Sequence, residues 1–449
     1  MLPPGFLCVQ IYFVLFPCHT EIEMVNLAVI GAGVGGCSAA YFARKFLPNV
    51  NVTIYDVQDR VGGRILTRNS GGVTLELGAA FFNRFNRTIM DIVRTEGLKF
   101  EPMKERADFA VWNGSEIVFR SSKQSAATYL RLLAKYKMSL VQTFLLIRKV
   151  RGQLAKLYQE ELKNPVDIGS LFESAGLHEW HKQSLAEVLL ERGISQHFID
   201  EVIAPITRTI YTQNAELGGF AGITSLLGVY SGETYSLAEG NSTLPVRLAE
   251  ASNAAVKLGQ KVDRIEKKHD DSYIVRAGEG EKVFDGVIIA TPLEIGDIEF
   301  DGISLPSWEP QRYQQVYRRV MRGVFNPVYF GLQDSAKLPA VMLTTKEADP
   351  LTQFSIQKSG SDNSLVTVSS PEPIRDEVFD GVFKKGGVTV LEHYWKAAYP
   401  IFKPVTKLPQ TRIDERLMYV SALEALVSSM ETSALSALNA VRMLSKEWH

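Results

Sequence analysis

A glycine-rich segment near the amino terminus has a spacing that could hold phosphate groups. Its pattern is Gly-x-Gly-x-x-Gly, formed by Gly31, Gly33 and Gly36. The apolar run 25–30 before it predicts a buried strand, and the small residues at 37–47 favour a helix. Gly31 permits a tight turn, Gly33 lets the backbone approach a diphosphate, and Gly36 lets the helix pack closely on the strand. The N–H groups and positive dipole end of that helix would then face the phosphate oxygens.

An acidic residue stands where a dinucleotide-binding turn needs one. A second strand is predicted at 50–55, and Asp56 follows it, 20 residues after Gly36. A carboxylate there can accept hydrogen bonds from ribose hydroxyls and would repel a 2′-phosphate, which argues against NADP. Strand, glycines, helix, strand and acid occur in the order of a Rossmann unit, so a glycine-rich turn without a ligand is the less favoured interpretation.

A second pair of glycines, flanked by two arginines, follows at once: Arg60, Gly62, Gly63 and Arg64. These residues suit another close approach of the backbone to a diphosphate, with a cationic side chain beside it. The whole Asp-x₃-Arg-x-Gly-Gly-Arg arrangement resembles the extended FAD fingerprint of the amine-oxidase-like flavoproteins. The longer pattern is much more specific than the first glycine spacing alone, and the resemblance implies FAD as the cofactor.

The same resemblance assigns cofactor contacts to segments far along the chain. A strand and turn after the second glycine pair pass near the flavin ring in those proteins. A distant valine corresponds to a residue whose backbone contacts adenine, and the N-terminus of the last helix is used against the ribityl chain and the inner phosphate. The residues assigned in this way are Gly78, Ala79, Val262, Thr291, Glu424, Met430 and Glu431.

Several internal segments narrow the resemblance to one family. They are 201–208, 211–213, 238–241, 395–403 and 424–438. From about Val25 to the C-terminus, the chain is similar to the prenylcysteine oxidases, also called prenylcysteine or farnesylcysteine lyases. Membership implies an FAD-dependent enzyme that cleaves the thioether of farnesyl- or geranylgeranyl-cysteine, a small-molecule product of the degradation of prenylated proteins. The reaction consumes O₂ and water and gives cysteine, a prenyl aldehyde and hydrogen peroxide.

The chemistry that the family implies needs few catalytic side chains. The carbon between sulfur and the prenyl chain is allylic, so loss of hydride to the flavin leaves a cation that sulfur and the double bond share. Because this step needs no strong protein base, we assign no catalytic residue. Weaker candidates for holding the substrate are Arg208, Tyr211 and Tyr399. Arg208 could bind the cysteine carboxylate or form a structural ion pair, and the tyrosines could instead pack in the core.

One segment and one single residue differ from the vertebrate members of the family. Segment 78–83 reads Gly-Ala-Ala-Phe-Phe-Asn, so a polar face of the turn becomes aromatic and the pocket changes shape. Ala425 stands where those relatives carry Cys. No nucleophile is then present for a covalent link, and FAD is expected to bind non-covalently.

The composition limits what else the chain can be. Its 49 Lys+Arg and 50 Asp+Glu give a formal net charge of -1, which does not favour a nucleic-acid partner. The three cysteines, Cys8, Cys18 and Cys37, exclude a disulfide framework and a Cys-rich zinc site, and we expect no metal ion. Two other functions stay open: an FAD amine oxidase or desaturase-like enzyme, and a flavin-binding relative without turnover.

The order of the motifs predicts an α/β fold with two interleaved domains. A Rossmann-type FAD-binding domain is discontinuous, and it is interleaved with an α+β substrate-binding domain. The FAD-binding parts are expected at 25–83, 236–295 and 406–449. The substrate domain is expected at 84–235, which is largely helical, and at 296–405.

The first 24 residues, 1–24, are either a signal peptide or a spurious leader. The apolar run 6–16 suits the core of a signal peptide, but no Lys or Arg precedes it. The family resemblance implies a lysosomal, vacuolar or secretory location, with a cytoplasmic one as the alternative. In a secreted chain, Asn86, Asn113 and Asn241 would be candidate glycosylation sites.

A long basic segment, 125–163, contains no proline and predicts one helix. Its eight basic residues and its apolar side are typical of a helix that lies on an anionic membrane surface. Such a helix could admit a prenyl substrate from the bilayer. The alternative is a helix of the substrate domain with a solvated basic face.

Overall fold

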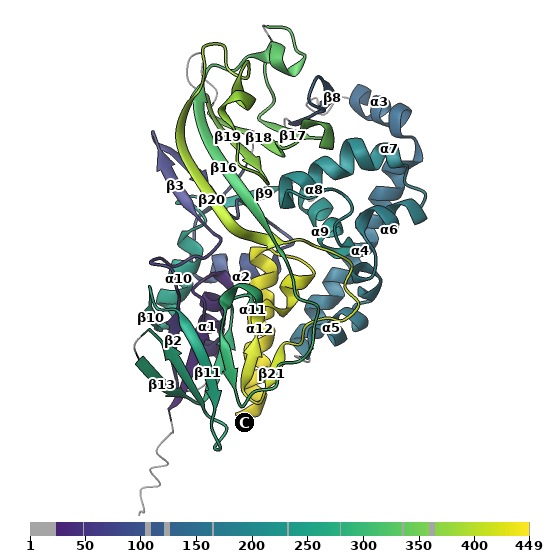
Figure 1. Ribbon diagram of the computed structural model, residues 1–449. Helices are drawn as coiled ribbons and strands as arrows, with labels where there is room; N and C mark the ends of the chain where they lie inside the picture. Colours follow the sequence, from purple (N-terminus) through teal and green to yellow (C-terminus); the bar gives the residue numbers. More distant parts are fainter. Residues whose placement is uncertain are drawn as a thin grey trace, which may run out of the picture.

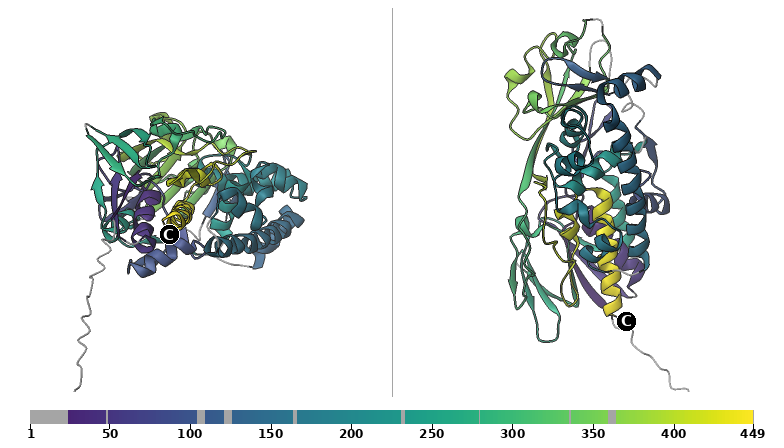
Figure 2. Two further views of the ribbon diagram at one scale, coloured as in Figure 1. Left: turned by 90° about the horizontal axis from the view of Figure 1, so that it is seen from below. Right: turned by 90° about the vertical axis from the view of Figure 1, so that its right-hand side faces the viewer.

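In the computed structural model, residues 24–47, 49–103, 109–120, 126–163, 166–230, 233–278, 280–334, 336–358 and 364–448 are described. The described chain begins and ends at the lower end of the molecule in Figure 1. The two views in Figure 2 show most of the helices gathered on one side of the sheets. The predicted leader, residues 1–24, lies outside the described residues except for Met24.

A six-stranded sheet gathers strands from distant parts of the chain (Figure 1). Its order is β10-β2-β1-β14-β22-β21, and its pairs are parallel except for β21 with β22. Parallel strands need crossover connections, so other layers cover both faces. The strands are β1 (Val25–Ile30), β2 (Val50–Tyr55), β10 (Ala255–Lys257), β14 (Gly286–Ile289), β21 (Arg412–Asp414) and β22 (Leu417–Tyr419).

Alternate side chains of β1 face two different layers, as the period of two in a strand requires. Leu27 and Val29 pack with three helices, whereas Ala28 and Ile30 belong to the same cluster as side chains of a four-stranded sheet. The helices are α1 (Val34–Phe46), α10 (Thr243–Ser252) and α12 (Met430–Glu447). The four-stranded sheet consists of β13 (Gly280–Phe284), β12 (Tyr273–Ala277), β11 (Val262–Lys267) and β15 (Glu299–Asp301).

A seven-stranded sheet forms the upper part of the molecule in Figure 1. Its order is β20-β16-β19-β18-β17-β7-β8, and all its pairs are antiparallel except β17 with β7. The long strands β16 and β20 run down toward the six-stranded sheet. The strands are β7 (Phe109–Trp112), β8 (Ile117–Arg120), β16 (Tyr313–Gly323), β17 (Val341–Thr344), β18 (Gln353–Lys358), β19 (Ser364–Ser370) and β20 (Val388–Pro400).

A group of helices packs beside this sheet, and two small sheets complete the architecture. The helices include α2 (Arg87–Thr95), α3 (Ala126–Tyr136), α4 (Met138–Lys163), α5 (Ile168–Ser174), α6 (Leu185–Glu191), α8 (Ala204–Tyr211) and α9 (Gly219–Tyr230). The small sheets are the hairpin β3 (Thr67–Ser70) with β4 (Val73–Glu76), and β5 (Phe82–Asn83), β9 (Thr234–Leu237) and β6 (Phe100–Pro102).

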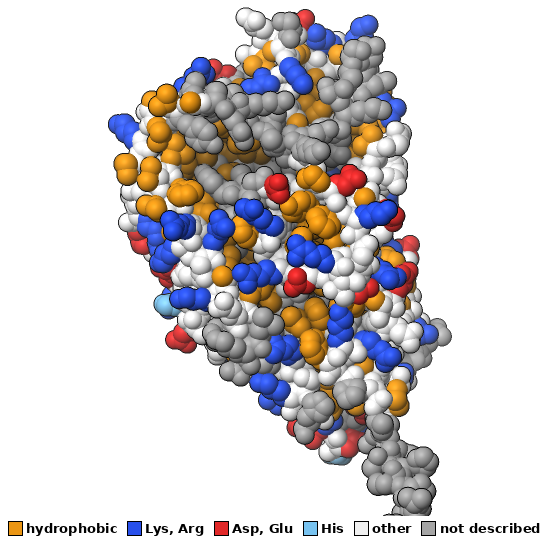
Figure 3. All heavy atoms as spheres, turned by 180° about the vertical axis from the view of Figure 1, so that it is seen from behind, with side chains coloured by type: hydrophobic (Ala, Val, Ile, Leu, Met, Phe, Trp, Pro, Cys, Tyr) orange, Lys and Arg blue, Asp and Glu red, His pale blue; other side chains and the backbone are white. Residues whose placement is uncertain are grey.

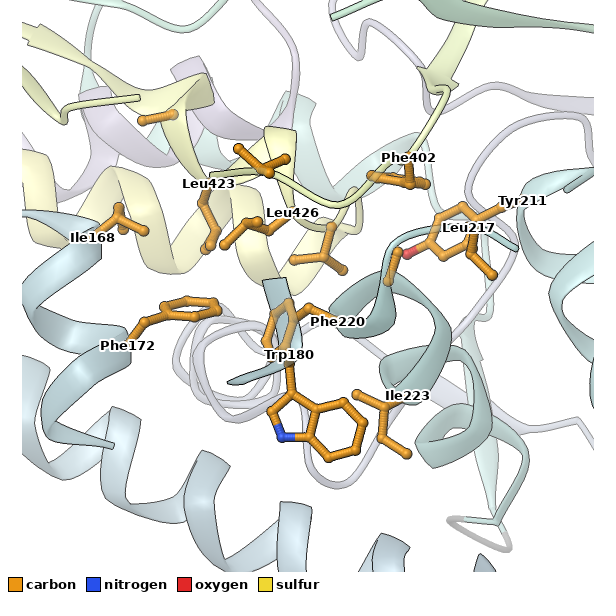
Figure 4. Close-up of a cluster of buried hydrophobic side chains, with 14 of the residues drawn as sticks. Ile168, Phe172, Trp180, Tyr211, Leu217, Phe220, Ile223, Phe402, Leu423 and Leu426 are labelled. Carbon is orange, nitrogen blue, oxygen red and sulfur yellow. The ribbon is translucent and has the colours of Figure 1, made fainter. Parts of the chain in front are cut away.

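A cluster of large apolar side chains joins the helices to the C-terminal part of the chain. Figure 4 shows Phe172, Trp180 and Phe220 from the helical part lying across from Leu423 and Leu426, which precede α12. The rings of Phe172 and Phe220 meet edge to face with centroids 4.7 Å apart. Burial of such rings is a large apolar contribution to stability, so this cluster fixes the helices against α12.

The predicted single helix over 125–163 is wrong in its continuity. Two helices, α3 and α4, are separated at Lys137, whose φ of 49° lies in the left-handed region. No glycine or proline marks this break in the sequence, so local signals could not reveal it. Position 125 lies outside the described residues. Within the described ranges, no helix is long and apolar enough to cross a membrane.

The strands of the six-stranded sheet come from residue ranges that the sequence assigns to the discontinuous nucleotide-binding domain. One pairing crosses an expected boundary: β15 lies beyond residue 295, yet it pairs in parallel with β11. The small four-stranded sheet therefore continues into the range that the sequence assigns to the second domain.

Replacing Trp180 with Ala should lower the free energy of unfolding by about 3–5 kcal/mol, because a large buried side chain leaves a cavity that its neighbours fill only in part. Trp180 is fully buried. Urea unfolding followed by circular dichroism measures this loss. Leu130→Ala is the control, because Leu130 is 66% exposed. A Trp180→Ala protein as stable as the control would contradict the role of the cluster.

Candidate functional site

Two cavities, about 1010 and 1020 Å³ in volume, meet beside the N-terminus of α12. We call the first the glycine-lined cavity, because both predicted glycine turns form its wall, and the second the amphiphilic cavity, because one wall is polar and another apolar. Residues that line both cavities define their junction. The junction is formed by Gly78, Ala79, Tyr399, Leu423, Val427, Ser428, Ser429, Met430 and Thr432.

The glycine-lined cavity brings together nearly all of the residues that the sequence assigned to the cofactor. Only Gly36 and Glu431 lie outside its lining. Residues separated by hundreds of positions therefore meet in one cleft. Those that line it are Gly31, Gly33, Asp56, Arg60, Gly62, Gly63, Arg64, Gly78, Ala79, Val262, Thr291, Glu424 and Met430.

The two glycine turns touch through their backbones. Gly33 and Gly62 form a parallel bridge, and the Gly62 N–H donates to the carbonyl oxygen of Ala32 at 2.8 Å. A Cβ atom on Gly63 would lie only 3.1 Å from the Cα of Gly33. A Cβ on Gly36 would overlap the carbonyl oxygen of Gly31, so only glycine fits at this buried position. The floor of the cavity is consequently backbone without side chains.

Polar side chains brace these turns from the sides. Asp56, which is 9% exposed, accepts hydrogen bonds from the Ala32 N–H at 2.6 Å and from the Gln58 N–H at 2.7 Å. Arg60 donates to the carbonyl oxygens of Gly63 at 2.6 Å and Ile65 at 3.0 Å. Arg60 therefore holds the second turn in shape as well as lining the cavity.

Arg64 is tied to the C-terminal segment. Its guanidinium forms an ion pair with Glu424 and donates to the carbonyl oxygen of Ala398 at 3.3 Å. The charge of Glu424 raises the pKa of Arg64 against the opposing effect of burial. This pair joins the second turn to the segment that follows Leu423 of the junction, so both residues serve to assemble the cleft.

The N-terminus of α12 points at the junction. The Ser429 hydroxyl accepts a hydrogen bond from the Thr432 N–H at 3.1 Å and caps the helix. The remaining free N–H groups and the helix dipole make this end favourable for an anion. Because Met430 lines both cavities, an anionic group in either one would meet this end of the helix.

Glu431 has a different position from the one that the sequence suggested. It lines the amphiphilic cavity, and its carboxylate accepts hydrogen bonds from the N–H groups of Thr88 and Ile89, both at 2.9 Å. The Tyr158 hydroxyl also donates to it at 2.7 Å. Burial raises the pKa of Glu431, while these hydrogen bonds lower it. Glu431 thus caps α2 and connects it to α12 and α4.

The amphiphilic cavity has chemically different walls. Side chains of α4, α5 and α9 form an apolar wall, and β4 together with the seven-stranded sheet forms a polar one. The apolar wall includes Ile147, Leu154, Leu157, Phe172, Phe220 and Leu227. The polar wall includes Thr74, Glu76, Arg318, Gln353, Ser355 and Thr367.

Two of the three candidate substrate residues lie at this cavity. The rings of Tyr211 and Tyr399 meet at 5.4 Å with an interplanar angle of 79°, and Tyr399 lines both cavities. The Tyr211 hydroxyl donates to the carbonyl oxygen of Ser428 at 3.0 Å. Burial is the main cause that raises the pKa of Tyr211, so its phenol stays neutral at physiological pH.

Arg208 is not brought to the site, which removes it as the candidate for a substrate carboxylate. It is 3% exposed and lines neither cavity. Its guanidinium forms an ion pair with Asp349 at 2.7 Å and donates to the carbonyl oxygens of Thr344 and Leu351, both at 3.0 Å. The structural ion pair that the sequence left as an alternative accounts for these contacts.

Sequence reasoning missed two charged residues at the polar wall, Glu76 and Arg318. The Arg318 guanidinium donates to the carbonyl oxygen of Glu76 at 3.1 Å. Burial raises the pKa of Glu76 to about 7. An acid immediately before the Gly78-Ala79 turn was a usable local signal for Glu76. No local signal marks Arg318, because 242 positions separate it from Glu76.

The described residues offer neither a metal-binding cluster nor a cavity-lining thiol. In the ranges that the structure describes, no group of three or more His, Cys, Asp or Glu side chains is arranged to hold a metal ion. Cys37 is buried under the first glycine turn, and burial, assisted by Asp56, raises the pKa of its thiol to about 12. Cys37, the cysteine within the described ranges, lines neither cavity, and Ala425 is buried.

Replacing Arg60 with Met should weaken FAD binding by about tenfold or more, because the carbonyls of the second glycine turn lose charge-assisted hydrogen bonds. Titration of the apoprotein with FAD, followed by flavin fluorescence, measures the change. Arg68→Met is the matched control, because Arg68 is exposed and, in the described part of the chain, its hydrogen bond goes to the carbonyl oxygen of Thr67. Equal FAD affinities of the two variants would contradict the bracing role of Arg60.

The sequence matches a family of known proteins over most of its length. Residues 119–449 match the prenylcysteine lyase family, and residues 29–95 match the NAD(P)-binding Rossmann-like domain. The chain is 27% identical to farnesylcysteine lyase of Arabidopsis thaliana, over 96% of this chain and 91% of that protein. It is also 27% identical to a Bos taurus protein named prenylcysteine oxidase 1-like, over 94% of this chain and 91% of that protein.

A solved structure has the same fold. Cyclohexylamine oxidase from Brevibacterium oxydans matches with a TM-score of 0.65 and 15% sequence identity, over 95% of this chain and 100% of that structure. The predicted Rossmann-type α/β fold class is confirmed, and so is the predicted family. The chain therefore belongs to the prenylcysteine lyase family, and it is an oxidoreductase.

Proposed function

We propose that this protein is an FAD-dependent oxidase that cleaves the thioether of farnesyl- or geranylgeranyl-cysteine. One O₂ and one water are consumed, and cysteine, a prenyl aldehyde and hydrogen peroxide are released. The observation that carries the proposal is the junction at Gly78, Ala79 and Tyr399, where the glycine-lined cavity opens on an amphiphilic one. A dinucleotide in the first cavity and an amphiphile in the second would meet there.

The residues of the glycine-lined cavity fit FAD. At the floor, a Cβ atom added to Gly63 would crowd Gly33, and Asp56 lines the cleft, where its carboxylate would face the ribose. Val262 lines the same cleft on the side where the adenine is expected. With no cysteine in the lining, we propose non-covalent binding. When bound, FAD supplies the hydride acceptor that the side chains lack.

The walls of the amphiphilic cavity suit the two ends of a prenylated cysteine. A C15 or C20 isoprenoid can lie along the apolar wall, where Phe172 and Phe220 exclude water from it. A volume of about 1020 Å³ is at the upper end of ordinary ligand pockets, which accords with a long substrate. Tyr211 and Tyr399 form an aromatic corner that would orient the thioether at the junction.

A membrane contact is the second part of the proposal. Exposed apolar side chains lie along α3 and α4, and basic side chains lie among them on the face shown in Figure 3. Phe144 is 59% exposed and also lines the amphiphilic cavity, as do Arg148 and Arg151. An anionic bilayer surface would complement both kinds of side chain and deliver the prenyl group to the cavity. The exposed apolar residues are Leu130, Leu133, Met138, Val141, Phe144 and Leu145.

We also propose a lysosomal, vacuolar or secretory location, on the basis of the family. Of the three candidate glycosylation sites, Asn241 is unsuitable in the folded protein because its side chain is 1% exposed. Its amide donates to the carbonyl oxygen of Ala79 and accepts from the Leu237 N–H, both at 3.0 Å. Asn86 and Asn113 are both half-buried and held in turns. The amide oxygen of Asn86 accepts from the Asn83 N–H, and that of Asn113 accepts from the N–H groups of Ser115 and Glu116.

Anaerobic mixing of the FAD-loaded protein with farnesylcysteine should remove the visible absorbance of the flavin, with free thiol and prenyl aldehyde appearing in equal amounts. S-dodecylcysteine is the control ligand, because it lacks the double bond that stabilises loss of hydride. Unchanged absorbance with farnesylcysteine, together with bleaching by an alkylamine, would favour an amine oxidase instead. A protein that never retains FAD would overturn the proposal.

Replacing Phe144 and Leu145 together with Glu should reduce flotation with anionic vesicles, because two exposed apolar side chains become charged and repel the lipid headgroups. Flotation with phosphatidylserine-containing and with neutral phosphatidylcholine vesicles measures the effect. The control is Val328→Glu, since Val328 is 56% exposed but lies outside α3 and α4. Equal recovery with both vesicle types, or no effect of the double change, would count against the membrane contact.

A further inference from the structure

Two charged residues on the polar wall of the amphiphilic cavity, Glu76 and Arg318, do not line the glycine-lined cavity. Glu76 ends β4 and Arg318 lies in the middle of β16, and both line the cavity. The only hydrogen bond of the Arg318 guanidinium within the described residues goes to the carbonyl oxygen of Glu76, at 3.1 Å. Arg318 is 9% exposed, and its Nε is buried without a partner. A buried cation with so few partners favours an anionic ligand.

The Glu76 carboxylate is held in place but has no cationic partner. It accepts hydrogen bonds from the Asn241 N–H at 2.7 Å and the Thr67 hydroxyl at 2.9 Å, and it forms no ion pair among the described residues. Burial raises its pKa to about 7, although both hydrogen bonds and the charge of Arg318 lower it. An added cation in the cavity would favour the ionised carboxylate.

The charged pair is fixed next to the junction. Glu76 lies two positions before Gly78. Asn241 links the two places, because its backbone N–H donates to the Glu76 carboxylate and its side-chain amide donates to the carbonyl oxygen of Ala79 at 3.0 Å. A group bound between Glu76 and Arg318 therefore places its next few atoms at the point where the two cavities meet. In an S-alkylcysteine those atoms are the β-carbon and the sulfur.

We infer that Glu76 and Arg318 form the subsite for a zwitterionic α-amino acid group. Glu76 binds the α-ammonium, and Arg318 binds the α-carboxylate. The alkyl chain then leaves the junction along the apolar wall of α4, α5 and α9. This inference rests on the proposed function. It explains how the protein would select free prenylated cysteine over a prenylated peptide, in which a peptide bond replaces a charged group.

Three other arginines at the cavity form a competing site for the carboxylate of the substrate. Arg87, Arg148 and Arg151 line the cavity near α4, but all three are exposed. The Arg151 guanidinium lies over the ring of Phe85 at 4.2 Å, and that of Arg87 lies over Tyr158 at 5.3 Å. Exposed arginines bind an anion more weakly than a buried one, because water competes for them.

The test measures binding of three ligands to the FAD-loaded protein without oxygen, by calorimetry. Farnesylcysteine carries both charges, its N-acetyl derivative lacks the ammonium, and its methyl ester lacks the carboxylate. The protein should bind farnesylcysteine at least about tenfold more tightly than either derivative. Glu76→Gln should abolish the preference over the N-acetyl derivative alone, and Arg318→Met should abolish the preference over the ester alone. Arg322→Met, on the same strand but outside both cavities, is the matched control.

Each contrary result has a distinct meaning. Equal binding of all three ligands to the unmodified protein overturns the inference without any variant. Loss of the ester preference in Arg151→Met, but not in Arg318→Met, places the carboxylate at the competing site and also overturns it. If Glu76→Gln does not fold, Glu76→Asp should keep the ammonium preference. Selective binding without bleaching of the flavin would refute the proposed oxidation and leave the subsite intact.

Discussion

The contact between two glycine turns is the constraint on which the site depends. Gly33 lies against Gly62 and Gly63, and a Cβ atom on Gly63 would lie only 3.1 Å from the Cα of Gly33. The floor of the first cavity is therefore bare backbone, open to a diphosphate. The surrounding polar groups stabilise this contact. Asp56 accepts a hydrogen bond from the backbone of the first turn, and Arg60 donates one to the backbone of the second.

A second set of contacts positions the substrate side of the site against that floor. The Trp395 indole donates to the carbonyl oxygen of Leu77 at 2.7 Å, and Arg318 donates to that of Glu76 at 3.1 Å. The seven-stranded sheet thus holds the strand and turn that lead to Gly78 and Ala79. The apolar cluster around Trp180 packs the helices against the segment before α12. The junction is therefore held both by the seven-stranded sheet and by this apolar cluster.

Local motifs made the nucleotide half of the site predictable from sequence. Gly31, Gly33 and Gly36 lie within one strand-helix-strand unit, and Asp56 and the second glycine turn follow its last strand directly, so their spacing was informative. The substrate half depended on long-range packing, which no spacing reveals. Arg208 lies in a family-like segment, yet it forms an ion pair with Asp349 away from the site. Arg318, from a distant strand, contacts Glu76 instead. The break at Lys137 was equally invisible, because a non-glycine residue adopts the left-handed conformation there.

The most direct test is a crystal structure of the protein with FAD and S-dodecylcysteine, a thioether without the allylic double bond. We predict the amino acid group between Glu76 and Arg318, the sulfur beside the Gly78-Ala79 turn facing the flavin, and the alkyl chain along α4 and α9. The reverse orientation, with the charged group near Arg151 and the chain against the seven-stranded sheet, would contradict this account of the site.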